Sequence, residues 1–228
     1  MKSVHRSVEV RYEERRSLFI TRMVPVETQE VAEAVIAAVK EEHARATHNV
    51  FAYIVGPDQR IQKMSDDGEP SGTAGMPSLE VLRKRGLTDV VAVTTRYFGG
   101  IKLGAGGLIR AYAKGVVLAL DEAVEIEKMP ATKLSLAIPY DKIGAMDYFL
   151  GSVRKIEDDR RYLAEVELDL ILLDVDKEIF VRQAAEILGA IPVTREEPYG
   201  TLDVHGDEIL KPYENTQRSE IDEYRTSD

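Results

Sequence analysis

The chain has 228 residues, of which 44% are apolar and 31% are charged, and it carries a net charge of -10. This composition is typical of a globular protein, and the length allows one large domain or two small ones. The chain has no cysteine, which excludes disulfides, thiolate nucleophiles and cysteine-based zinc sites. No apolar run reaches the roughly 18 residues of a membrane span, and the N-terminus lacks a signal-peptide core, so we expect a cytoplasmic protein without a membrane partner.

The charge is unevenly distributed along the chain. Seven basic residues and one acidic residue lie between Arg83 and Lys114, whereas residues 203–228 hold eight acidic and three basic residues. The negative total disfavours non-selective attraction to nucleic acid, and nothing implies DNA specifically. A basic segment inside an acidic protein indicates a local anionic ligand, and the alternative is that these charges are ordinary solvated ends of a helix and a strand.

The first half of the chain predicts alternating strands and helices. Alternating and β-branched residues indicate strands over 7–14 and 17–24, and an apolar face repeating about every four residues indicates a helix after Thr28. Further strands are expected at 49–56, 60–63 and 88–98. Helices are expected from Pro77 to Gly86, and around an apolar face that runs from Leu108 to Leu120.

A change in the residue pattern near Pro130 predicts a domain boundary. Beyond it, strands and helices are expected in the order βαββαβ, which is the ferredoxin-like plan. The pattern becomes charged and polar after Leu202. We therefore predict an α+β fold with two domains, residues 1–129 and a ferredoxin-like domain over 130–202, followed by a flexible acidic tail over 203–228.

The first of two glycine-rich loops, residues 65–75, is rich in carboxylates and hydroxyls. Its ligand-binding candidates are Asp66, Asp67, Glu69, Ser71 and Thr73. The three acids suit a hard cation such as Mg²⁺ or acid–base chemistry, although short acidic clusters beside glycine usually form turns. The spacing of a calcium-binding loop is absent and no histidine lies in the loop, so we predict no metal site and leave any cofactor undetermined.

Two histidines lie upstream of this loop. Ser71 and Thr73 would act as nucleophiles only beside a general base, and His43 and His48 are the candidates for that role. His43 falls on the apolar face of a predicted helix, which is more typical of packing. We therefore select His48, with its neighbour Asn49, as ligand-binding candidates.

The second glycine-rich loop follows an apolar strand and leads into a helix. Its ligand-binding candidates are Arg96, Gly99, Gly100, Lys102, Gly104, Gly106 and Arg110. Residues 99–104 match the glycine spacing of a P-loop, but the required lysine is missing. The dinucleotide fingerprint that starts at Gly104 fails at Ile109, where it needs glycine. The remaining physical feature is a flexible backbone with N–H groups at a helix start, where phosphate, sulfate or carboxylate binds.

Three long motifs carry a family resemblance. They are ATHN at 46–49, SDDGEPSGTAG at 65–75 and TRYFGGIKLGAGGLIRAY at 95–112. On these motifs the chain is identified as a member of the YigZ/IMPACT family, with the resemblance covering 16–123. The resemblance implies an N-terminal α/β domain similar to domain IV of elongation factor G, and a ferredoxin-like second domain similar to its domain V.

The resemblance to translation-factor domains also implies contact with RNA or the ribosome, and the eukaryotic relatives are translational regulators. Our leading hypothesis is a non-enzymatic protein that binds RNA, the ribosome or another phosphate-bearing ligand through the glycine-rich loops, Arg96, Lys102 and Arg110. One alternative is a metal-assisted hydrolase of a phosphorylated or peptide substrate that uses the three loop acids. Another is a protein-interaction module that docks through the exposed face of the second domain's sheet.

Overall fold

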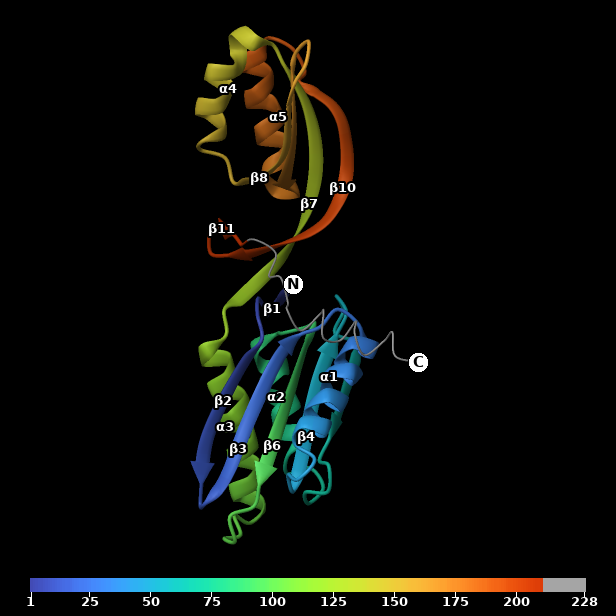
Figure 1. Cartoon of the computed structure of the whole chain (residues 1–228), viewed down its shortest axis with the longest axis vertical. Helices are drawn as coiled ribbons and strands as arrows, with labels where there is room; N and C mark the ends of the chain where they lie inside the picture. The colour runs from blue at the N-terminus through green and yellow to red at the C-terminus, as the bar shows by residue number, and fades with distance from the viewer. Residues whose placement is uncertain (211–228) are drawn as a thin grey trace. The chain divides into compact units, whose positions relative to one another are not determined.

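The computed structural model describes residues 1–210. These residues form two compact units, of which the first spans Met1–Ile126 and the second begins at Glu127 (Figure 1). The chain opens with a short strand, β1 (Lys2–Val4), whose Lys2 carbonyl accepts a hydrogen bond from the backbone of Thr88.

The first unit is built on a five-stranded antiparallel sheet. In spatial order its strands are β2 (Val8–Glu14), β3 (Ser17–Pro25), β6 (Val90–Tyr97), β4 (His48–Val55) and β5 (Ile61–Ser65). β6 lies at the centre and is buried from Val90 to Arg96, because both of its faces are covered. The strands predicted for the first half of the sequence are therefore confirmed.

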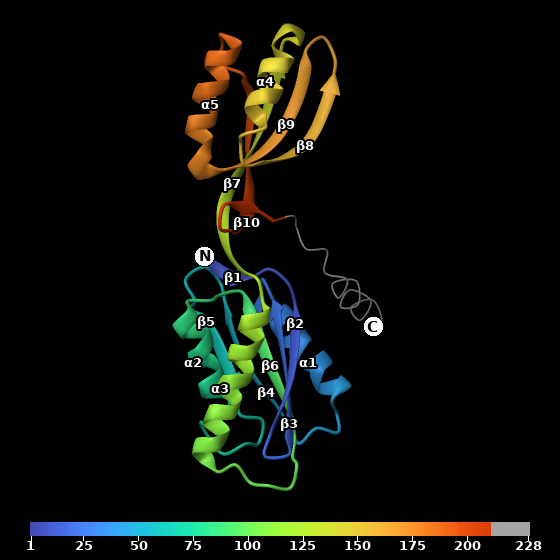
Figure 2. The ribbon, with the colours of Figure 1, turned by 90° about the vertical axis from the view of Figure 1, so that its left-hand side faces the viewer.

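Three helices cover the two faces of this sheet, and they confirm the predicted helical segments (Figure 2). Helix α1 (Gln29–Glu42) packs its apolar residues on one face, whereas α2 (Gly75–Arg85) and α3 (Ala105–Glu122) pack on the other. The buried residues of α1 recur at intervals of four, with Ala32 before Ile36 and Val35 before Val39, as expected for an amphipathic helix. None of the helices that the structure describes is long and apolar enough to cross a membrane.

Four connections of the first unit lie at one end of its sheet, at the bottom of Figure 1. They are the turn from β2 to β3, the connection from α1 to β4, the loop from β5 to α2 and the loop from β6 to α3. The antiparallel register requires this, because β2, β5 and β6 all end there while β3 and β4 begin there. We call this region the loop end.

The second unit follows the predicted βαββαβ order. Its elements are β7 (Glu125–Ile138), the short 3₁₀ turn Tyr140–Lys142, α4 (Ile143–Leu150), β8 (Lys155–Tyr162), β9 (Val166–Leu173), α5 (Asp174–Leu188), β10 (Val193–His205) and β11 (Glu208–Ile209). The strands are ordered β11-β10-β7-β9-β8, and both helices pack on one face of the sheet. An α+β fold with a ferredoxin-like strand order is therefore observed.

Two sequence-based boundaries differ from the element limits. The expected domain boundary at Pro130 falls inside β7, which runs without interruption from Glu125 to Ile138. The tail predicted from residue 203 begins inside β10, because Leu202 and Val204 alternate with more exposed neighbours and are buried. The rest of the predicted tail, residues 211–228, lies outside the described residues.

Candidate functional site

Asp66 holds the N-terminus of α2 in place. Its Oδ1 accepts hydrogen bonds from the backbone nitrogens of Ala74 (3.0 Å) and Gly75 (2.8 Å), and its Oδ2 accepts one from Gly72 (2.8 Å). Burial alone would raise the pKa of Asp66, but these backbone hydrogen bonds outweigh it and lower the pKa below its ordinary value. Both carboxylate oxygens are thus used to cap a helix and close its loop.

Asp67 ties the loop to α1 and β4. Its Oδ1 accepts a hydrogen bond from Lys40 Nζ at 2.7 Å, and its Oδ2 accepts one from the backbone nitrogen of Asn49 at 2.6 Å. The residue has φ +44°, in the left-handed region, and its carbonyl oxygen accepts a hydrogen bond from His48 Nδ1 at 2.8 Å. Burial would raise the pKa of Asp67, but the hydrogen bonds from Lys40 and Asn49 lower it. Asp67 therefore fixes the loop against the sheet.

Glu69 enters a buried polar network with Arg96. Its Oε1 accepts hydrogen bonds from Arg96 Nη1 at 2.6 Å and from the Tyr112 hydroxyl at 2.8 Å, while His48 Nε2 lies 3.8 Å from its Oε2. Arg96 is 5% exposed and also donates to Ser17 Oγ at 3.2 Å. Burial, followed by the Glu69 charge, raises the pKa of Tyr112 well above its usual range, so this hydroxyl stays protonated. The network buries one positive and one negative charge as a pair.

The remaining polar candidates of the first loop differ in exposure. Thr73 is buried and donates its hydroxyl to the carbonyl of Pro70 at 2.6 Å, whereas Ser71 is exposed. Asn49 is buried and accepts a hydrogen bond from Thr95 at 2.7 Å. His43 bonds to the Tyr97 hydroxyl at 3.0 Å and is not joined to the network around Glu69. Within residues 1–210, no cluster of three His, Asp or Glu side chains is arranged to hold a metal ion.

The second loop approaches the β2–β3 turn closely. A Cβ at Gly99 would lie 1.8 Å from the carbonyl oxygen of Arg16, so only glycine fits there. Gly104 has φ +71° and precedes α3, which has no side-chain cap and no acidic residue in its first turn. Glycine at the N-cap has no side chain that could accept a hydrogen bond from the first-turn N–H groups, in contrast to Thr28 before α1.

The charged candidates of the second loop other than Arg96 are exposed. Gly100, Lys102, Gly104, Gly106 and Arg110 all face solvent, whereas Gly99 is partly buried. Arg110 folds back along α3, because a Cβ at Gly106 would lie 3.6 Å from its Nη1. Neither Lys102 nor Arg110 forms an ion pair with any residue in the described part of the chain.

The two loops adjoin through a shared apolar cluster. Ala74 from the first loop and Leu108 from α3 belong to the same buried group, against which Leu103 packs. The hydrogen bond from Tyr112 on α3 to Glu69 in the first loop links them a second time. The structure therefore brings both predicted loops to the loop end, although it places most of the first loop's charges in internal contacts.

Phe98 lies at the surface between these groups. It is 46% exposed, and its backbone nitrogen donates to Thr47 Oγ1 at 3.0 Å. The guanidinium carbon of Arg96 lies 5.5 Å from the Phe98 ring centroid and 5.4 Å from that of Phe19. The buried cation thus supports one face of an exposed aromatic ring.

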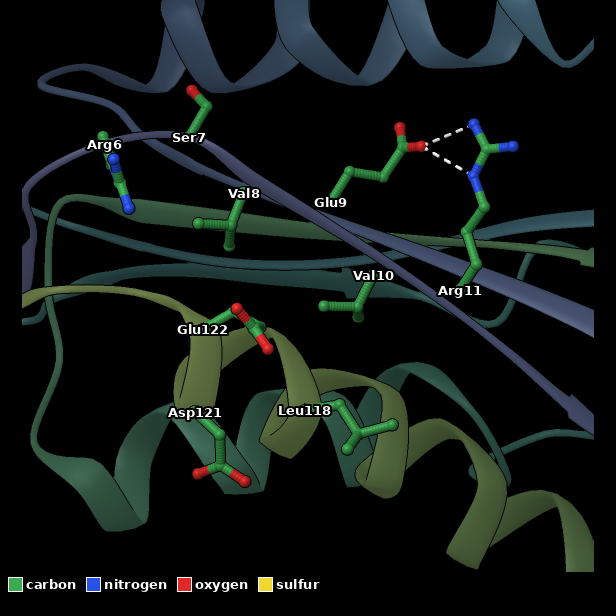
Figure 3. A pocket seen from close by; sticks show the side chains of 9 residues that line it. All are labelled: Arg6, Ser7, Val8, Glu9, Val10, Arg11, Leu118, Asp121 and Glu122. Carbon is green, nitrogen blue, oxygen red and sulfur yellow. Dashed lines mark hydrogen bonds and ion pairs between the residues drawn. The ribbon is translucent and has the colours of Figure 1, made fainter.

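An open groove of about 580 Å³ lies elsewhere, between the start of β2 and the end of α3 (Figure 3). It is lined by Arg6, Ser7, Val8, Glu9, Val10, Arg11, Leu118, Asp121 and Glu122. Its charges are mixed, and Glu9 pairs with Arg11 at 2.7 Å. None of the predicted site residues lines this groove.

Sequence reasoning missed several residues that shape the loop end. The roles of Lys40 and Ser17 could not be predicted, because their partners, Asp67 and Arg96, are distant in the sequence. Tyr112 belongs to the apolar face predicted from Leu108 to Leu120, and only the structure shows that its hydroxyl reaches Glu69. A usable signal existed for the β2–β3 turn, because the two-residue gap between the predicted strands requires a tight turn with special backbone angles.

Comparison with known proteins identifies the family. Residues 15–120 match the model of the Impact N-terminal domain. The chain is 41% identical to "IMPACT family member YvyE" of Bacillus subtilis (strain 168), over 75% of this chain and 79% of that protein. It is 39% identical to "IMPACT family member YigZ" of Escherichia coli (strain K12), over 63% of this chain and 72% of that protein.

Solved structures give a further comparison. A "hypothetical protein" with 34% sequence identity covers 81% of this chain and 91% of its own, with a TM-score of 0.56. The structure of the "two-domain translational regulator Yih1" has 23% identity, covers 52% of this chain and 46% of its own, and has a TM-score of 0.33, too low to compare the folds. The sequence matches, which extend over most of the length of YvyE, show that this chain belongs to the IMPACT family.

Proposed function

We propose that this protein binds a phosphate-bearing partner, RNA or the ribosome, through the loop end, and that it acts in translation regulation. The observation that carries the proposal is that Lys102 and Arg110 are exposed and form no ion pair within residues 1–210, close in sequence to the start of α3, where the N-cap is a glycine without a capping side chain. Cations that the fold does not neutralise are available to a ligand, and backbone N–H groups at a helix start favour an anion.

The net charge of -10 restricts where such a partner binds. An acidic surface repels polyanions, so binding is favoured only where cations are concentrated. At the loop end, the three acids of the first loop, Asp66, Asp67 and Glu69, accept hydrogen bonds from other groups of the protein. The exposed charged side chains of the second loop, Lys102 and Arg110, are both positive in an acidic protein.

The proposed role in translation rests on family membership. The solved relative Yih1 is described as a translational regulator, and the motif resemblance points to eukaryotic regulators of translation. RNA and ribosomes present dense phosphate groups, which match exposed Lys and Arg side chains. We therefore name RNA, free or within the ribosome, as the partner.

A salt titration of RNA binding tests the proposal. Anisotropy of a labelled, unstructured RNA is measured with the parent protein and with Lys102→Ala/Arg110→Ala. Loss of two phosphate contacts is expected to weaken binding about tenfold and to reduce the slope of log K against log salt by about 1.4. The charge-matched control, Arg6→Ala/Lys84→Ala, removes two exposed cations away from the loop end and is expected to bind as the parent does. Equal binding by the Lys102/Arg110 variant would refute the proposal.

A further inference from the structure

The turn between β2 and β3 places two arginines in an unfavourable backbone conformation. Glu14 pairs with Ser17 across the hairpin, so Arg15 and Arg16 alone form the turn. Their φ angles are +46° and +64°, in the left-handed region. Two-residue turns of this kind favour Asn-Gly, because residues with larger side chains are strained at positive φ. The fold itself thus gives no reason for two arginines here.

This turn lies directly beside the second loop. A Cβ at Gly99 would lie 2.7 Å from the Cβ of Arg16, which shows how closely the two segments approach. Both arginines are exposed, and neither forms an ion pair within residues 1–210. Glu14, the acid before the turn, pairs with Lys114 at 3.9 Å. Two uncompensated guanidinium groups therefore adjoin the proposed phosphate site.

A third segment adds another cation on the other side of Phe98. Arg45 lies in the connection between α1 and β4, and it is exposed without an ion pair in the part of the chain that the structure describes. Two residues later, Thr47 accepts the hydrogen bond from the Phe98 backbone. Because β6 lies between β3 and β4, the connections before β3 and before β4, which carry these exposed arginines, flank the end of β6 that leads into Phe98.

This combination of groups suits one class of ligand. Several separated cations match successive phosphates of a strand, whereas an isolated phosphate needs only one or two donors. An exposed ring with one face held by a cation offers its remaining surface for base stacking. Bases in a duplex are stacked on one another and cannot reach the ring, whereas unpaired bases can.

We propose that the Arg15–Arg16 turn and Phe98 form a binding surface for single-stranded RNA, with phosphates on the arginines and a base stacked on Phe98. This inference rests on the proposed function and extends it to residues outside the two glycine-rich loops. It also specifies the state of the partner, which is an unpaired strand.

Replacing the turn by Arg15→Asn/Arg16→Gly separates binding from folding. Asn-Gly suits the turn, so the variant is expected to unfold at a higher urea concentration than the parent. Its affinity for an unstructured RNA of about 12 nucleotides is nevertheless expected to fall about tenfold. Arg6→Ala/Lys84→Ala again serves as the charge-matched control. A stable variant that binds RNA as tightly as the parent would overturn the role of the turn.

Phe98→Ala and a duplex competitor test the stacking component. Loss of the ring is expected to weaken binding about tenfold at every salt concentration, without changing the salt slope, because stacking releases no counterions. A duplex RNA of the same length is expected to compete less well than the single strand. Equal competition by the duplex, or full affinity of Phe98→Ala, would overturn the stacking.

The variants also distinguish this inference from the proposed function. If Lys102→Ala/Arg110→Ala weakens binding while the turn and Phe98 variants do not, only the further inference fails. If none of these variants weakens RNA binding, both fail.

Discussion

The two loops are both rich in glycine and in charge, but the structure uses their charges in opposite ways. In the first loop, Asp66, Asp67 and Glu69 each accept hydrogen bonds from other parts of the protein. In the second loop, Lys102 and Arg110 are exposed and lack ion pairs within residues 1–210. A charged loop thus stabilises the fold where its charged groups have partners inside the protein, and it is available to a ligand where it has no such partners within residues 1–210.

The largest effect is expected at Glu69. Glu69→Ala leaves the buried guanidinium of Arg96 without its carboxylate and the Tyr112 hydroxyl without its acceptor. Removing one partner of a buried ion pair costs about 3–5 kcal/mol, so the free energy of unfolding, measured by urea denaturation, is expected to fall by that amount. The exposed Glu13→Ala is the control, with a change within about 0.5 kcal/mol. A Glu69→Ala variant as stable as this control would show that the network does not support the fold.

A smaller effect is expected at Asp66. Asp66→Ala leaves three backbone N–H groups at the start of α2 without their acceptor. Loss of such a helix cap costs about 2 kcal/mol at most, which thermal or urea unfolding resolves. Lys102→Ala in the second loop is expected to change stability by less than about 0.5 kcal/mol. Equal losses in the two variants would remove the distinction between the loops.

The smallest effect is a dependence of stability on acid. The folded state lowers the pKa of Asp66 and Asp67 below their ordinary value of 3.8. Their contribution to stability is therefore complete above about pH 5, and it is lost as the pH falls through 4 and below. Urea denaturation between about pH 3 and 7 is expected to show this loss, and Asp66→Asn is expected to reduce it. An identical pH dependence in parent and variant would contradict the role given to Asp66.

The sequence predicted the elements well because their apolar periodicity is strong. In the alternating strand over 7–14 the apolar residues are less exposed than most of their charged neighbours, and the apolar face of α1 buries the expected residues. The strand order of the second unit also followed from the order of its predicted elements. These features depend on local pattern, which a single sequence contains.

The use of the loop residues could not be predicted in the same way. Arg96 was a candidate phosphate ligand, and its buried pairing with Glu69 depends on a residue 27 positions away. Arg15 and Arg16 were not selected, although the short gap between two predicted strands indicates a turn with positive φ. Partners across a fold are set by tertiary packing, which is why the sequence pointed to the two loops but did not separate supporting from exposed charges.

The most direct test of the account uses Phe98→Trp. The chain contains no tryptophan, so the introduced indole is the only one and reports on the loop end alone. Stacking of an unpaired base on this ring is expected to quench its fluorescence as single-stranded RNA is added, with less quenching at the same RNA concentration when Arg15→Asn/Arg16→Gly is also present. Unchanged fluorescence at RNA concentrations that saturate binding by anisotropy would contradict the account.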